Sequence, residues 1–185
     1  MNHAVLNAAK EKMEKSLQML RSELAKVRTG RASTSMLDDI RVEYYGNPSP
    51  LNQVATLGVP EPRTLTISPW DASLIPVIEK AIRTSNLGLT PANDGKLIRL
   101  PIPPLTEERR RDLVKGVKKQ GEESKVAIRH VRREAMDELK DLEKEKKITE
   151  DEHKHLGSEV QKLTDQFVAK VDETLVHKEK EVMEV

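Results

Sequence analysis

The sequence predicts an α+β fold in which a small β/α/β domain is inserted into an elongated three-helix bundle. Long segments at both ends of the 185-residue chain repeat apolar residues at steps of three and four, the period of an amphipathic helix. The segment between them alternates apolar and polar residues, as half-buried strands do, and contains several prolines. We therefore expect a bundle built from residues 1–30 and 104–185, with an inserted domain over residues 31–103.

The first predicted helix carries one apolar stripe and ends close to a glycine. Gly30 follows Thr29, and glycine adopts the left-handed conformation of a helix C-cap with little strain. We therefore expect this helix to stop at Thr29-Gly30. Its stripe consists of Leu6, Ala9, Met13, Leu17, Leu20, Leu24 and Val27.

Two more long helices are predicted after the prolines that close the insert. Thr106 is placed as the N-cap of the first, which at about 40 residues would be ~60 Å long. Within its stripe only Gly121 and Ser124 lie between residues 117 and 128, so a neighbouring helix should approach closely there. The second begins with Thr149 and Glu152 in the spacing of a capping box. Because the connection at residues 146–148 is short, these two helices should be antiparallel neighbours.

The inserted segment predicts three strands and a short helix. Alternation indicates strands at residues 40–44, 64–67 and 98–102, and residues 46–50 are expected to form a turn. Asp71 is placed as the cap of a helix that presents Ile75, Ile78 and Ile82 on one side, and Pro101 should confine the last strand to a sheet edge.

The two connections between bundle and insert predict a hinge. Both ends of the insert should lie at one end of the bundle, so two short chain segments join the bodies. Such a pair of connections allows the two bodies to bend relative to each other but limits free tumbling of one against the other. The hinge residues are Gly30, Arg31, Pro103, Pro104 and Leu105.

Composition indicates a soluble cytoplasmic protein without membrane contact. Charged residues make up 34% of the chain and aromatic residues only 2%, which is typical of long, solvent-exposed helices. No run of residues approaches a membrane-spanning length. The absence of cysteine excludes disulfides and thiolate metal sites, and it suits a reducing compartment.

Charge is unevenly distributed along the chain. The net charge is only +1, yet residues 105–133 contain 10 Lys/Arg against 5 Asp/Glu. Residues 134–185 contain 9 against 16, and no arginine follows Arg133. This asymmetry predicts that different surfaces of the protein contact different neighbours.

A search for catalytic patterns predicts no catalytic residue, cofactor or metal site. The sequence has no phosphate-binding Gly-x-x-x-x-Gly-Lys, no Gly-x-Ser-x-Gly and no His-Glu-x-x-His. His153 and His155 point in divergent directions on a helix, so we interpret them as solvated polar residues.

The second long helix has a candidate nucleic-acid contact, which we call the basic face. Its members recur at helical steps and lie roughly 110° around the helix from the apolar stripe. A solvated surface and a phosphate contact both fit this pattern. The planar, forked guanidinium group of arginine favours phosphate binding. The scarcity of aromatic residues indicates contact with the nucleic-acid backbone rather than base stacking. The basic face consists of Arg111, Lys115, Lys118, Lys125, Arg129 and Arg132, flanked by Arg110 and Arg133.

Five separated strings resemble the ribosome recycling factor family, in order and from end to end of the chain. No one of them is a chemical signature, but together they are highly specific. They are Lys-Val-Arg-Thr-Gly-Arg-Ala-Ser at residues 26–33, Val-Glu-Tyr-Tyr-Gly at 42–46, Leu-Gly-Leu-Thr-Pro at 87–91, Pro-Pro-Leu-Thr-Glu-Glu-Arg-Arg at 103–110 and Val-Arg-Arg-Glu-Ala at 131–135.

The resemblance implies an L-shaped, two-domain protein that works on the ribosome. Members of this family bind the large ribosomal subunit after peptide release. With elongation factor G and GTP they split the ribosome so that its subunits can be reused. Their bundle contacts ribosomal RNA through arginines that match Arg110, Arg129, Arg132 and Arg133 here. We expect a monomer that needs no cofactor.

Two functions from other classes remain open on the residues alone. A coiled-coil tether fits the long apolar repeats, but it leaves the proline-rich insert unexplained. A phosphate-processing enzyme could use the arginines, but the sequence offers it no nucleophile, base or metal site. Measuring binding to ribosomal subunits would distinguish the coiled-coil tether from a ribosome-binding factor. Measuring nucleotide turnover by the isolated protein would distinguish the enzyme from a binding protein.

Overall fold

The computed structural model describes residues 4–184, which divide into two compact units. The first unit contains the described residues up to Arg28 and from Thr106 onward, and the second is Thr29–Leu105. Each unit has its own buried apolar core. Residues 1–3 and 185, which the predicted bundle includes, lie outside the described part of the chain.

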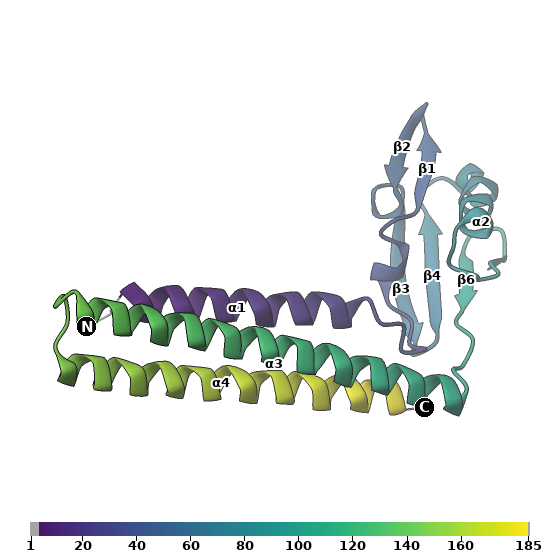
Figure 1. Cartoon of the computed structure of the whole chain (residues 1–185). Coiled ribbons are helices and arrows are strands. Elements are labelled where there is room, and N and C mark those ends of the chain that lie inside the picture. Colours follow the sequence, from purple (N-terminus) through teal and green to yellow (C-terminus); the bar gives the residue numbers. More distant parts are fainter. Residues whose placement is uncertain (1–3, 185) are drawn as a thin grey trace. The chain divides into compact units, whose positions relative to one another are not determined.

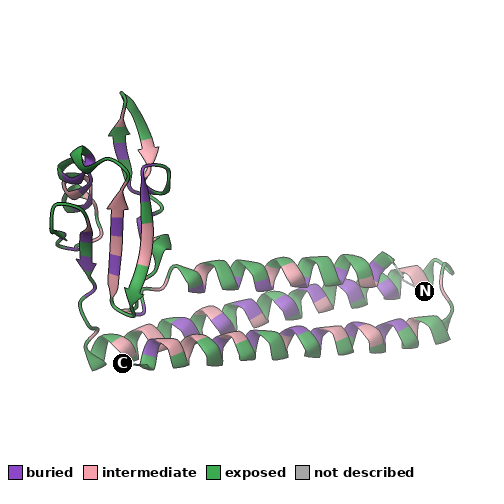
Figure 2. Cartoon of the chain, turned by 180° about the vertical axis from the view of Figure 1, so that it is seen from behind, coloured by how far each residue is buried: buried purple, intermediate pink, exposed green. Residues whose placement is uncertain are grey.

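The first unit is a bundle of three helices, as predicted. Helices α1 (Ala4–Ala25), α3 (Glu107–Lys144) and α4 (Glu150–Met183) lie side by side, and each contacts the other two (Figure 1). Buried residues recur along the inward sides of these helices, and the outward sides are exposed (Figure 2). The period of three and four therefore gives each helix one face to bury.

Helices α3 and α4 approach closely at a glycine, as the gap in the apolar stripe predicts. A Cβ atom on Gly121 would lie 2.3 Å from Cδ1 of Leu175. No real Cβ approaches another carbon so closely, so only glycine permits this approach without a shift of the neighbouring leucine. Ser124, one turn further along, is also buried.

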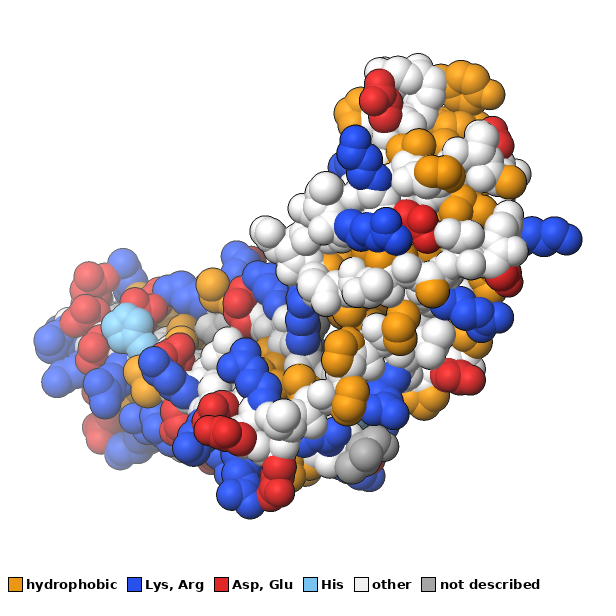
Figure 3. All heavy atoms as spheres, turned by 90° about the vertical axis from the view of Figure 1, so that its right-hand side faces the viewer, with side chains coloured by type: hydrophobic (Ala, Val, Ile, Leu, Met, Phe, Trp, Pro, Cys, Tyr) orange, Lys and Arg blue, Asp and Glu red, His pale blue; other side chains and the backbone are white. Residues whose placement is uncertain are grey.

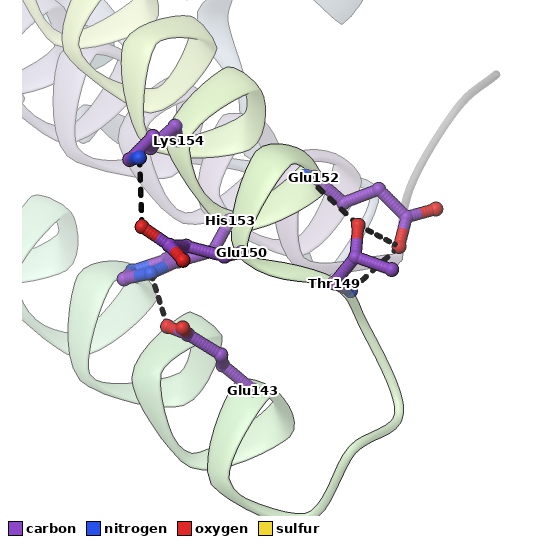
Figure 4. A network of polar contacts seen from close by, with 6 residues as sticks. All are labelled: Glu143, Thr149, Glu150, Glu152, His153 and Lys154. Carbon is purple, nitrogen blue, oxygen red and sulfur yellow. Dashed lines mark hydrogen bonds and ion pairs between the residues drawn. The ribbon is translucent and has the colours of Figure 1, made fainter.

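Both predicted N-caps of the long helices are present. The Thr106 hydroxyl accepts a hydrogen bond from the Arg109 backbone N–H at 3.2 Å. Thr149 and Glu152 form a reciprocal capping box at the start of α4 (Figure 4). Each cap satisfies backbone N–H groups that have no partner within the helix.

One histidine that we expected to be solvated is instead held between two helices. Nδ1 of His153 lies 2.5 Å from a carboxylate oxygen of Glu143, and the histidine side chain is only 25% exposed (Figure 4). This contact joins the first turn of α4 to the last turn of α3. The prediction failed because the partner comes from the preceding helix, across the connection.

Helix α1 ends earlier than predicted. Its last residue is Ala25, and the backbone N–H groups of Lys26 and Val27 bond to carbonyls three residues back, which tightens and ends the helix. Gly30 is left-handed, with φ +81°, but it lies beyond this end and does not cap the helix.

The second unit combines two antiparallel sheets with one α-helix. One sheet has two strands, and the other has four in the order β3-β4-β6-β5. Short 3₁₀ turns cover Thr34–Leu37, Leu51–Gln53 and Ala72–Leu74. The elements are β1 (Arg41–Tyr44), β2 (Asn47–Pro50), β3 (Ala55–Glu61), β4 (Thr64–Pro69), α2 (Ile75–Thr84), β5 (Ala92–Asn93) and β6 (Ile98–Pro101).

The predicted helix and strands of the insert are present, but three strands were not predicted. Residues 47–50 form β2, paired with β1, instead of belonging to a turn, and β3 and β5 are also additional. The placement of β6 at an edge was wrong, because β5 pairs with its other side. Pro101 has no N–H to donate, and its place in the strand allows this. The N–H of the next residue, Ile102, donates to the carbonyl of Arg63 on the β4 side. The Pro101 nitrogen therefore faces the other side of β6, beyond the end of the short β5.

Helix α2 supplies the apolar cover of this unit. Ile75, Ile78 and Ile82 are buried on its inner side, as predicted, and the Asp71 side chain accepts from the Ser73 N–H before the helix. They share one core with strand residues that include Leu65 and Ile98, both fully buried.

No helix in the described part of the chain combines the length and apolar character that a membrane crossing requires.

Candidate nucleic-acid interface

Two residues at the start of the basic face pair with carboxylates of the same helix. The guanidinium of Arg111 forms an ion pair with Glu107, one turn earlier. Nζ of Lys115 lies 3.8 Å from a carboxylate oxygen of Asp112. Both cations are exposed, so each pair is screened by water and stabilises the helix only slightly.

Two more lysines of the basic face bind α4. Nζ of Lys118 lies 3.8 Å from Glu179, and Nζ of Lys125 lies 2.5 Å from Asp172 and 3.1 Å from Glu122. Hydrogen bonds to Asp172, and then to Glu122, raise the pKa of the Lys125 ammonium group. With its side chain 14% exposed, Lys125 is part of the contact between α3 and α4.

Among the arginines of the basic face and its flanks, Arg129 and Arg133 remain open to a ligand. Both side chains are exposed, and neither forms an ion pair or side-chain hydrogen bond with any residue in the range 4–184. They lie about 40° apart around the helix, at about 100° per residue, so both reach one surface. Val126, one turn before Arg129, is 60% exposed and lies on the same side.

Arg132 is half-buried and is held by a polar side chain of α4. Its Nη1 donates to Oε1 of Gln161 at 2.9 Å, and Nε2 of Gln161 donates to Oδ1 of Asp165 at 2.9 Å. The Nε atom of Arg132 is buried and has no partner among the described residues. The sequence did not single out Gln161 or Asp165, because no local pattern relates them to an arginine on another helix.

Arg110 has a structural contact of its own. Its Nη1 donates to the backbone carbonyls of Val182 at 3.2 Å and Glu184 at 2.7 Å. These carbonyls belong to the C-terminal end of α4, where a positive charge is favourable because of the helix dipole. Any phosphate at Arg110 would therefore share the guanidinium with the end of α4.

The predicted hinge residues lie at the boundary of the second unit. An ideal Cβ on Gly30 would lie 3.2 Å from Cγ of Leu105, so the two ends of the unit are in contact. Pro103 and Pro104 are exposed, and Arg31 is exposed while it interacts with other residues. Within residues 4–184, no group of three or more His, Asp or Glu side chains is placed to hold a metal ion.

The charged surface of the protein is mixed rather than uniformly basic. On the face shown in Figure 3, Lys and Arg side chains alternate with Asp and Glu along the helical unit. This agrees with the pairing described above, in which Arg111, Lys115, Lys118 and Lys125 each have a carboxylate within reach. Arg129 of the basic face and the flanking Arg133 therefore have no ion pair or side-chain hydrogen bond within residues 4–184 that would compete with an anionic partner.

Comparison with known sequences identifies the family. The family model described as ribosome recycling factor matches residues 20–183. The ribosome-recycling factor of Trichlorobacter lovleyi is 62% identical over 185 residues, and that of Geobacter metallireducens is 64% identical over 185 residues. In both cases the match covers 100% of each chain. The chain belongs to the ribosome recycling factor family.

Solved structures of ribosome recycling factors have the same fold. A solution structure of a ribosome recycling factor is 42% identical and superposes with a TM-score of 0.75, covering 98% of this chain and 96% of that chain. A second is the T. thermophilus ribosome recycling factor, described with E. coli elongation factor G bound to the E. coli post-termination complex. It is 49% identical, with a TM-score of 0.63 and 97% coverage of both chains.

Proposed function

We propose that this protein binds the post-termination ribosome and, with elongation factor G and GTP, promotes its dissociation into reusable subunits. The observation that carries this proposal is similarity to ribosome-recycling factors along the full chain, at 62% identity over 185 residues. The related T. thermophilus factor, described with elongation factor G on a post-termination complex, supports the choice of partners.

We propose further that the bundle contacts ribosomal RNA of the large subunit through α3. Arg129 and Arg133 support this proposal because they are exposed and form no ion pair or side-chain hydrogen bond within residues 4–184. Arg132 supports it because only part of its guanidinium is occupied. Arg110 stays in the proposed set, as a contact shared with the end of α4. Lys125 contributes to the bundle rather than to RNA.

We also propose that the two units move about Gly30, Arg31, Pro103, Pro104 and Leu105. The boundary between the compact units passes between Arg28 and Thr29 and between Leu105 and Thr106, which supports a hinge at these segments. The left-handed backbone of Gly30 supports it too, because a side chain there would be strained.

In this proposal the protein is a non-catalytic cytoplasmic factor. The free energy for splitting comes from its GTP-hydrolysing partner, and this chain supplies binding surfaces and a change of geometry. Purified protein that hydrolyses GTP at a rate proportional to its own concentration, after contaminating GTPases are removed, would refute the non-catalytic role.

Ribosome splitting followed by light scattering tests the whole proposal. Post-termination ribosomes should dissociate when this protein, elongation factor G and GTP are all present. Dissociation should be lost when any one of the three is omitted. If scattering stays unchanged with all three present, the proposed function is wrong for this protein.

A further inference from the structure

Arg132 differs from the paired cations of α3 in the chemistry of its partner. Arg111, Lys115, Lys118 and Lys125 each have a carboxylate partner, which neutralises charge. Arg132 instead donates to the uncharged amide of Gln161. The side chain is therefore fixed in place while its positive charge is retained.

Gln161 is itself oriented by a second contact. Its amide nitrogen donates to Asp165 at 2.9 Å, and its amide oxygen accepts from Arg132 at 2.9 Å. Because an acceptor lies on one side and a donor on the other, only one orientation of the amide satisfies both. Asp165 thus acts on the amide of Gln161, with no hydrogen bond to the guanidinium.

The contacts of Arg132 leave one part of its guanidinium for a ligand. A guanidinium has five N–H donors. One on Nη1 binds Gln161, and the Nε–H is buried without a partner in the described chain, so about three N–H groups remain on the two Nη atoms. Two N–H groups side by side are the geometry that binds two oxygens of one phosphate.

The buried Nε atom supports a functional reason for this arrangement. Buried polar groups in native proteins nearly always have a partner, and exceptions need an explanation. A freely rotating arginine could turn this N–H toward water. The contact with Gln161 instead holds the side chain so that its Nη atoms are available to a ligand, while the Nε–H stays buried without a partner in the described chain.

We infer that Gln161 and Asp165 are positioning residues that hold the Arg132 guanidinium, with its charge intact, ready to bind a phosphate of RNA. This inference rests on the proposed contact between α3 and ribosomal RNA. It adds a requirement that the contact alone does not make: residue 161 must be polar and uncharged.

The variant Gln161→Glu separates positioning from a purely structural role. A carboxylate at residue 161 would bind Arg132 more strongly and would compete with phosphate. We therefore expect about tenfold weaker binding to the large subunit, the order expected for one lost charge-assisted contact. The unfolding midpoint should stay close to the parent's, because the stronger pair with Arg132 is offset by the lost hydrogen bond to Asp165 and by repulsion between two carboxylates four residues apart. The slope of log affinity against log salt concentration should fall by about 0.9 or less.

Gln166→Glu is the matched control. It adds the same charge to the same helix at an exposed residue that forms no hydrogen bond or ion pair with Arg132. Gln161→Met should give a smaller loss of binding, because the guanidinium is no longer held but keeps its charge. In an Arg132→Ala background, Gln161→Glu should have no more effect than Gln166→Glu.

The outcomes distinguish this inference from the function on which it depends. If Arg132→Ala weakens subunit binding but Gln161→Glu behaves like Gln166→Glu, the positioning role is wrong and the RNA contact stands. If Arg132→Ala has no effect on binding, both the contact at Arg132 and the positioning role are wrong. If Gln161→Glu weakens binding equally in the Arg132→Ala background, the effect does not pass through Arg132, which also overturns the inference.

Discussion

The ammonium group of Lys125 on α3 lies 2.5 Å from a carboxylate oxygen of Asp172 on α4, although its sequence position places it on a charged helix face. Its side chain is 14% exposed, whereas Arg129, one turn later, is exposed and forms no ion pair or side-chain hydrogen bond among residues 4–184. Neighbouring cations on one face thus have different roles. Some hold the bundle together, and others are available to a partner.

Replacing Lys125 should affect stability rather than binding. Lys125→Met keeps most of the apolar stem and removes the ion pair with Asp172, so the free energy of unfolding should fall by about 1 kcal/mol. Binding to the large ribosomal subunit should stay close to that of the parent. Urea unfolding and a subunit-binding assay measure the two effects. A loss of binding as large as that of Arg129→Ala would show that Lys125 belongs to the interface.

The pH dependence of the same pair has a definite sign. Hydrogen bonds to Asp172, then to Glu122, raise the pKa of Lys125 above the ordinary 10.5. A pKa raised by folding stabilises the protein fully below the unfolded pKa, and the stabilisation is lost as pH rises through the folded value. The difference in unfolding free energy between the parent and Lys125→Met should be constant near neutral pH and should shrink above about pH 10.5. A difference that grows with alkaline pH would contradict this.

Two glycines of α3 should respond in opposite directions to alanine. Gly121→Ala places a Cβ 2.3 Å from Leu175, so the overpacked contact should destabilise the bundle by about 1–3 kcal/mol. Gly116 has nothing within 4 Å of its Cβ position, so Gly116→Ala should stabilise the helix by about 0.5–1 kcal/mol. Thermal unfolding of both variants provides the comparison. Equal effects would show that α3 and α4 do not pack closely at Gly121.

Substitution at Gly30 should impair ribosome splitting more than binding. Gly30→Val forces a β-branched residue into a backbone with φ +81° and presses on Leu105, 3.2 Å from the Cβ position. Gly95→Val is the control, because Gly95 has φ +89° but open space around it, in a turn away from the proposed hinge. Light scattering measures splitting, and a subunit-binding assay measures binding. Gly30→Val should lose more splitting than binding, and Gly95→Val should not. Equal losses of splitting and binding in Gly30→Val would leave the hinge without support.

The helices were predictable because their signals are local. The apolar period and the caps at Thr106 and Thr149 specify where α3 and α4 begin, without knowledge of any partner. Strand β3 was missed because Gly58 and Pro60 interrupt its alternation, and its extended form depends on pairing with β4. Strands defined by their neighbours cannot be read from their own residues.

The candidate site was predictable only in part, for a related reason. Helical spacing accounts for pairs within α3, such as Arg111 with Glu107 and Lys115 with Asp112, but it cannot say which cations pair with another helix. The partners of Lys125 and Arg132 include Asp172 and Gln161 of α4, which are distant in sequence. Packing of α3 against α4 therefore divides the basic face into paired and open residues, and a sequence pattern does not contain that information.

Binding to the large ribosomal subunit across a salt series tests the account most directly. Arg129→Ala with Arg133→Ala should weaken binding and reduce the log–log salt slope by about two units or less, because each lost phosphate contact removes counterion release. The control is Lys15→Ala with Lys154→Ala, two exposed lysines of α1 and α4 that pair with carboxylates of their own helices. We predict that the control keeps the parent's affinity and slope. Arginine and lysine pairs that behave alike would contradict the proposed interface.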